Sequence, residues 1–170
     1  MPPEVRCPGC GAMVPDIEEL RSRNLYIGAA AGCFAAYTDL LGRLLGDASL
    51  GEARMLSVDT YMAQHPGVPG RQSSQSVWVH LVGLCLSLEH GFDGLASARA
   101  KARLAAPDAR FSWLEPPAEL GALTVFDVLA VPGDELAAAV RGWTDSVWLA
   151  WEPHHDAVRA RAKELLRGIE

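Results

Sequence analysis

Residues 73–90 read SSQSVWVHLVGLCLSLEH, and this stretch decides the fold class. Apolar residues recur in it at the three- and four-residue spacings of an α-helix. They occupy two faces, with Val77, Leu81, Leu84 and Leu88 on one and Trp78, Val82 and Cys85 on the other. A helix that is apolar on two faces is packed on both sides, so the stretch predicts a central helix that ends before Gly91.

Similar patterns predict helices before this central one. An apolar stripe runs from Phe34 to Leu45 and ends at Gly46, a residue type common after a helix C-terminus. Ser49 and Glu52 have the spacing of a capping box and predict the start of a second helix. That helix must end before Pro66, because proline disfavours helical geometry in the preceding residue.

Further helices are predicted after the central one. We expect a short helix over residues 94–104, a capped turn at Thr124 and Asp127, and a long helix capped by Asp134. Pro153 either kinks this long helix or begins a new one. Residues 107–123 are rich in proline and predict a loop anchored by aromatic side chains. The sequence thus predicts an all-α fold, a helical bundle of four to five helices.

Composition limits the class of protein. The 170 residues suit one domain, residues 1–170, with 49% hydrophobic and 21% charged residues. The net charge of −6 and pI of about 5.3 argue against a nucleic-acid partner, which requires a basic surface. Residues 1–6 have no apolar stretch typical of a signal peptide, and no segment is apolar enough to span a membrane. The expected location is the cytoplasm.

The most specific chemical signal is Cys7-Pro8-Gly9-Cys10-Gly11. Two thiolates separated by two residues can bind one tetrahedral Zn²⁺, and the glycine that follows permits the tight turn required. We therefore interpret residues 1–30 as a zinc-knuckle loop packed on a bundle of residues 31–170. A redox dithiol and an inert pair use the same spacing and stay open as alternatives.

The remaining metal ligands must come from elsewhere in the chain. Cys33 is the leading third ligand because a helix N-terminus favours a thiolate, although a small core residue is the alternative. His65 is the leading fourth ligand, since it ends a helix before a Pro/Gly loop. His80 and His155 are further candidates, each with a hydrogen-bonded core histidine as the alternative. Phosphate-binding loops, nucleophile elbows and H-E-x-x-H helices are absent from the sequence.

A set of short segments is spread over most of the chain: Cys7-Pro8-Gly9-Cys10-Gly11, Gly32-Cys33-Phe34, Gln64-His65-Pro66-Gly67, Ser76-Val77, Val79-His80-Leu81, Leu123-Thr124-Val125, Trp143, Trp148 and His154-His155. Together these segments resemble a bacterial family of small proteins known as domain of unknown function 5946. The resemblance implies a shared fold and groups Cys7, Cys10, Cys33, His65, His80 and His155 as one functional set. It implies no activity.

Two functions follow as hypotheses from different classes. In the first, zinc is structural, four protein ligands fill its coordination sphere, and the protein binds another protein, a small molecule or a second copy of itself as a homodimer. In the second, the chain is a metal-dependent hydrolase or transferase, with His80, His155 and Asp59 around an open metal position. The number of protein ligands at the metal separates the two.

Overall fold

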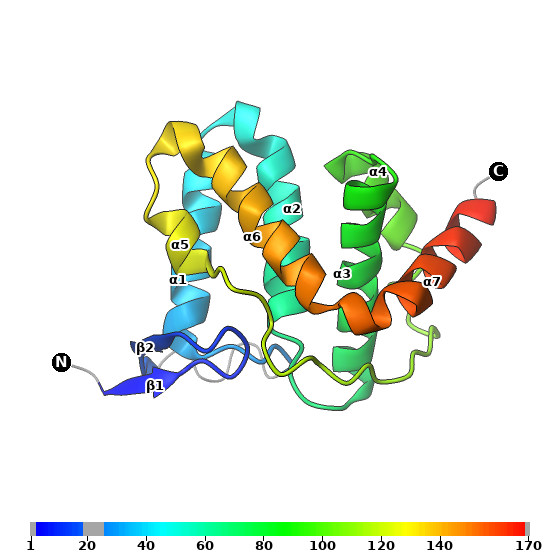
Figure 1. The fold of residues 1–170 in the computed structure, drawn as a ribbon, viewed down its shortest axis with the longest axis horizontal. Helices are drawn as coiled ribbons and strands as arrows, with labels where there is room; N and C mark the ends of the chain where they lie inside the picture. Colours follow the sequence, from blue (N-terminus) through cyan, green and yellow to red (C-terminus); the bar gives the residue numbers. More distant parts are fainter. Residues whose placement is uncertain (1–2, 19–25, 169–170) are drawn as a thin grey trace.

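The fold is known from a computed structural model, which describes residues 3–18 and 26–168. Helices dominate it, so the predicted fold class is confirmed, with one small sheet in addition (Figure 1). The described elements are β1 (Glu4–Arg6), β2 (Met13–Pro15), α1 (Ala31–Leu45), α2 (Gly51–Gln64), α3 (Arg71–Glu89), α4 (Gly94–Lys101), α5 (Val125–Leu129), α6 (Leu136–Ala150) and α7 (His155–Arg167), with short 3₁₀ turns at Ala48–Leu50, Gly133–Glu135 and Glu152–His154.

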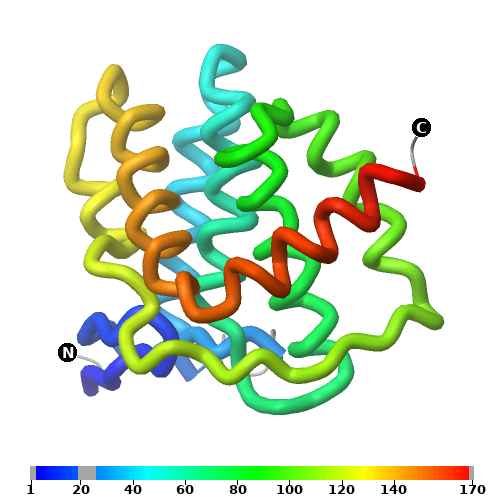
Figure 2. Tube along the Cα trace, turned by 45° about the vertical axis from the view of Figure 1, so that its right-hand side comes forward, coloured from blue at the N-terminus to red at the C-terminus, as the bar shows by residue number. Residues whose placement is uncertain are grey.

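The helices pack around α2 and α3 (Figures 1 and 2). Helix α2 lies between α3 and α6 and also contacts α1, while α3 is covered by α4 and α7. Both apolar faces of α3 are buried, including Leu81 and Val82 at 0% exposure, as the pattern of residues 73–90 predicts. The centre of the bundle is therefore built on the segment that the sequence singles out.

Two of the tryptophans lie at the centre of this core. Trp143 and Trp151 are 0% exposed, and their indole N–H groups donate to the Gln64 side-chain oxygen at 3.0 Å and to the Ala63 carbonyl at 3.1 Å. The Gln64 amide nitrogen in turn donates to the Leu120 carbonyl at 2.9 Å. Each buried indole thus has a partner, as close packing in a bundle requires.

Two predicted helix caps are wrong. Ser49 lies in a 3₁₀ turn capped by Asp47, and the Glu52 carboxylate accepts from the Gly94 backbone N–H instead of capping its own helix. Asp134 also lies in a 3₁₀ turn, and α6 begins after it without a side-chain cap. The predicted capped turn at Thr124 and Asp127 is confirmed at α5, where the two residues form a capping box.

The chain changes direction at Pro153 and begins a new helix. A 3₁₀ turn over Glu152–His154 ends α6, and α7 starts at His155, so the proline separates two helices. The described helices include none that is both long and apolar enough to cross a membrane.

The hairpin and one long loop meet at the same end of the bundle. Val5 of β1 pairs with Val14 of β2, and the hairpin lies against the N-terminal end of α1 (Figure 1). Contact is so close that a Cβ on Gly32 would lie 2.4 Å from the Pro15 carbonyl oxygen. The loop before α5 crosses this end of the molecule (Figure 2). Residues 1–2 and 19–25 of the predicted knuckle loop lie outside the described residues.

Candidate metal centre

Cys7 and Cys10 lie on the turn that joins β1 to β2. The Cys7 backbone N–H donates to the Ala12 carbonyl at 2.8 Å, and the Gly11 N–H donates to the Cys7 carbonyl at 2.9 Å. Gly11 has φ of +75°, a left-handed conformation that glycine adopts without strain. The glycine after the second cysteine therefore serves the tight turn that the sequence predicts.

Two long-range neighbours complete a cluster with these cysteines. Cys33 lies in the first turn of α1 at 0% exposure, and His65 follows the last residue of α2 at 1% exposure. The Cys33 sulfur lies 3.7 Å from the Cys10 sulfur and 3.4 Å from His65 Nε2. All four ligand atoms lie within 4.8 Å of one another, close enough to bind a single metal ion.

The surroundings orient the ligand atoms toward this common point. His65 Nδ1 lies 2.7 Å from the Tyr61 carbonyl, which can only accept, so Nδ1 carries a proton and Nε2 is the ring nitrogen that faces the sulfurs. The Tyr61 ring packs on the imidazole at 4.1 Å, and its hydroxyl donates to the Cys33 sulfur at 3.7 Å. The Ala30 N–H donates to the Cys7 sulfur at 3.4 Å. Such outer contacts fix ring orientation and charge at metal sites.

The electrostatics favour a cation among the sulfurs. Hydrogen bonds from Cys10 and Cys33 hold the pKa of Cys7 well below its usual value. Hydrogen bonding with Cys10 and Cys7, together with burial, raises the pKa of Cys33 far above its usual value. One thiolate is thus stabilised, and a second beside it is opposed. A bound dication would favour ionisation of all the thiols, as metal–thiolate sites require.

The electrostatic environment of His65 also favours a positive charge. Burial lowers the pKa of this imidazole, but hydrogen bonds with Cys10 and Cys7 outweigh it and raise the pKa to about 9. The imidazole therefore lies in a strongly negative environment, where a metal ion bound at Nε2 would supply the positive charge instead of a proton.

Gly9 lies where the turn between β1 and β2 approaches the end of α2 too closely for a side chain to fit. A Cβ on Gly9 would lie 2.4 Å from His65 Cδ2 and 2.5 Å from the Gln64 carbonyl oxygen. We expect Gly9→Ala to displace His65 or the turn and to weaken metal affinity by about 10- to 100-fold, the range for changes to groups that orient metal ligands. Chelator competition measures the affinity.

Gly42→Ala is the matched control for Gly9→Ala. Gly42 lies within α1, and a Cβ there would meet nothing within 4 Å. We expect it to stabilise the helix by about 0.5–1 kcal/mol and to leave metal affinity unchanged. Equal affinities for the Gly9→Ala protein and the wild type would contradict the close approach.

The other predicted ligands lie apart from this cluster. His80 Nδ1 donates to Asp59 Oδ1 at 2.7 Å, and Lys101 Nζ donates to the same oxygen at 2.5 Å. His155 stacks on Trp148 with ring centroids 3.9 Å apart, and its Nε2 bonds to the Trp148 carbonyl at 2.9 Å.

These contacts correct two expectations. The four-residue cluster is the one group of three or more histidine, cysteine or acidic side chains in the described part of the chain that could hold a metal ion. The open site of His80, His155 and Asp59 is therefore not assembled, although Asp59 and His80 do pair. The resemblance groups six residues as one set, and four of them come together.

The sequence analysis missed one residue that supports the metal cluster and one that supports the pair of Asp59 and His80. Tyr61, one helical turn before His65, orients the imidazole, and its spacing of four residues was the available signal. Lys101 completes the Asp59 ion pair from a distance of 42 residues, for which the sequence carries no local signal.

Comparison with known proteins identifies one related group. The model of a family of unknown function (DUF5946) matches residues 5–152, a span that contains all four residues of the cluster. No curated protein and no solved structure shows significant similarity to the chain.

Proposed function

The chain belongs to the family of unknown function DUF5946, and we propose that it is a helical binding protein stabilised by one structural Zn²⁺. The proposed ligands are Cys7, Cys10, Cys33 and His65. In this proposal the metal ties the N-terminal hairpin to α1 and α2, and the chain acts through what it binds.

The distances between the ligand atoms support zinc as the bound metal. With Zn–S bonds of about 2.3 Å and a Zn–N bond of about 2.0–2.1 Å, a regular tetrahedron has S···S edges of about 3.8 Å and S···N edges of about 3.5 Å. The Cys10–Cys33 and Cys33–His65 separations are 3.7 Å and 3.4 Å. Three thiolates and one imidazole form a common donor set of structural zinc sites, and soft sulfur ligands disfavour Mg²⁺ or Ca²⁺.

Four protein ligands support a structural role rather than a catalytic one. Catalytic zinc keeps one position for water or substrate, whereas a Cys₃His set fills the tetrahedron. Apart from Cys7 itself, Val14 is the one buried residue of the hairpin in the described part of the chain, so the ion would add to the small core of this hairpin.

The proposal includes a partner and a compartment. We infer that the partner is another protein or a small molecule, since the proposed zinc offers no reactive position. Reduced thiols in such a cluster are typical of the cytoplasm, which we propose as the location.

Metal analysis tests the zinc proposal directly. Full-length protein purified without chelator is expected to contain about one equivalent of zinc, because one tetrahedral set is present. Elemental analysis measures the zinc. Replacement by Co²⁺ should give the intense visible bands of tetrahedral cobalt and the near-ultraviolet charge-transfer band of thiolate ligands. Protein free of metal, or a cobalt derivative with the weak bands of six-coordinate oxygen ligation, would refute the proposal.

A further inference from the structure

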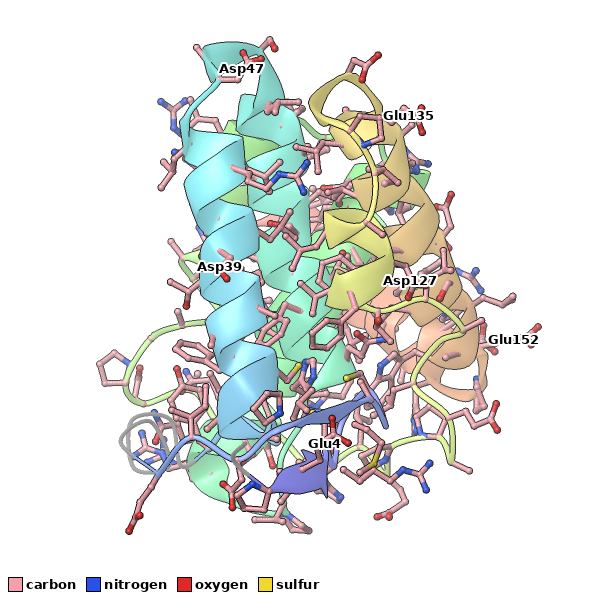
Figure 3. All side chains as sticks on the ribbon, turned by 90° about the vertical axis from the view of Figure 1, so that its left-hand side faces the viewer. Glu4, Asp39, Asp47, Asp127, Glu135 and Glu152 are labelled. Carbon is pink, nitrogen blue, oxygen red and sulfur yellow. The ribbon has the colours of Figure 1, made fainter. Side chains whose placement is uncertain are left out.

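A second candidate site lies at the other end of the bundle. A cavity of about 250 Å³ opens between α2, α4 and α6 and contains none of the four cluster residues. Helix α4 lies at the end of the molecule away from the hairpin (Figure 1). Figure 3 shows the same two ends of the bundle, with Glu4 of the hairpin at one end and Asp47, before α2, at the other. The cavity is therefore independent of the proposed zinc ion.

Ser97 gives this cavity an unsatisfied polar group. The residue lines the cavity, is 2% exposed, and its Oγ has no hydrogen-bond partner among the described residues. It is also the one buried side-chain oxygen or nitrogen of the described chain in this condition. Buried hydroxyls are almost always paired, because an unpaired one is destabilising. The hydroxyl is thus available to hydrogen-bond to an occupant of the cavity.

Lys101 lies one helical turn after Ser97 and faces the same cavity. Its ammonium group bonds to Asp59, which is 3% exposed and also accepts from His80. Asp59 is the sole partner of Lys101 Nζ in the described part of the chain, which leaves further N–H donors for an occupant. The inner wall therefore offers N–H and O–H donors from a cation and a hydroxyl, which suit the oxygen atoms of an anion.

The backbone is adapted to bring these groups together. Gly83 lies within α3, and a Cβ there would lie 2.3 Å from Asp59 Oδ2 and 2.8 Å from Lys101 Cδ. Glycine in a helix interior lowers helix stability. Its presence permits the polar group from α2 and α4 to lie directly against α3.

Apolar side chains form much of the remaining wall of the cavity, and the cavity is small. Met55, Leu56 and Phe92 line it, while Glu52 and Arg141 are exposed residues of its lining. The volume of about 250 Å³ lies below the roughly 300–1,000 Å³ typical of drug-sized ligands, so the occupant is a small molecule.

We propose that this cavity binds a small monocarboxylic acid with an apolar body. The carboxylate oxygens accept hydrogen bonds from Ser97 Oγ and Lys101 Nζ, and the apolar body packs on Met55, Leu56 and Phe92. A dianion such as phosphate fits less well, because Asp59 and Glu52 also line the cavity.

Hexanoate, hexylamine and 1-hexanol are the probes, because they share one apolar chain and differ in the polar group. Titration of the zinc-loaded full-length protein, followed by ¹⁵N NMR, is expected to give saturable shifts at Ser97 and Lys101 with hexanoate. Hexanoate should bind about ten-fold more tightly than hexanol, since a hydrogen bond to a charged group exceeds a neutral one. Hexylamine should give no saturable shift there.

Ser97→Ala isolates the hydroxyl. We expect it to weaken hexanoate binding by about ten-fold. The melting temperature of the ligand-free protein should not fall, because the lost hydroxyl has no internal partner. Ser73→Ala is the matched control, a buried serine that does not line the cavity, and should leave hexanoate binding unchanged. The proposal fails if hexanoate gives no saturable shift, if hexylamine binds as tightly, or if Ser97→Ala binds hexanoate like the wild type.

Discussion

Cys33→Ser is expected to leave the protein without its zinc and to lower its free energy of unfolding by about 4 kcal/mol when free zinc is 1,000-fold above the dissociation constant. Cys33 is fully buried, and its sulfur lies 3.7 Å from the Cys10 sulfur and 3.4 Å from His65 Nε2. A serine hydroxyl stays protonated at neutral pH and is a poor zinc ligand. Elemental analysis and chemical denaturation, each with and without chelator, measure the two effects.

Cys85→Ser is the matched control for Cys33→Ser. Cys85 is also 0% exposed, but it lies within α3 and outside the cluster. Both variants bury a new hydroxyl group. If only Cys33→Ser loses zinc, the loss is therefore caused by the missing metal ligand and not by the buried hydroxyl. The helices should persist in Cys33→Ser by far-ultraviolet circular dichroism, because α2, α3 and α6 also pack on one another through apolar faces away from the metal. A Cys33→Ser protein that retains one equivalent of zinc would refute Cys33 as a ligand.

Asp59→Leu is expected to lower the free energy of unfolding by about 3–5 kcal/mol, the cost of leaving a buried charge without its partner. The side chains of Asp59, Lys101 and His80 are 4%, 12% and 16% exposed, so water screens this ion pair weakly. Without the carboxylate, the Lys101 ammonium loses its partner among the described residues. Urea denaturation measures the change.

A double substitution separates the ion pair from simple packing. Adding Lys101→Met to Asp59→Leu should recover most of the lost stability, since apolar replacement of a whole buried pair is often neutral or stabilising. Arg141→Met is the control, because its pair with Asp145 is 56% exposed on both sides and such pairs contribute about 0–1 kcal/mol. The interpretation fails if Asp59→Leu costs no more than Arg141→Met.

Local pattern by itself determined the helices and half of the candidate metal site. The two apolar faces of residues 73–90 predict a central helix, because helical periodicity depends only on neighbouring residues. Cys7 and Cys10 are predicted for the same reason, since a spacing of two residues already brings two sulfurs to one turn. The capped turn at Thr124 is another local feature that the structure confirms.

Only the tertiary structure decided which distant residues join Cys7 and Cys10 in the cluster. The contacts of Cys33 with Cys10 and His65 span 23 and 32 residues, and the packing of the hairpin and α2 against α1 brings these atoms together. The same packing turns His80 toward Asp59 and His155 toward Trp148, away from the cluster that the resemblance implied. Local spacing treats these histidines alike, because it carries no information on which helix faces which.

The predicted cap of Glu52 failed for the same physical reason. Its carboxylate could accept either from its own helix terminus or from a backbone N–H brought near by folding, and it bonds to Gly94, 42 residues away. Lys101 reaches Asp59 over the same separation. Sequence periodicity determines the element that carries each side chain, whereas the partner of a polar side chain depends on the packing of whole elements.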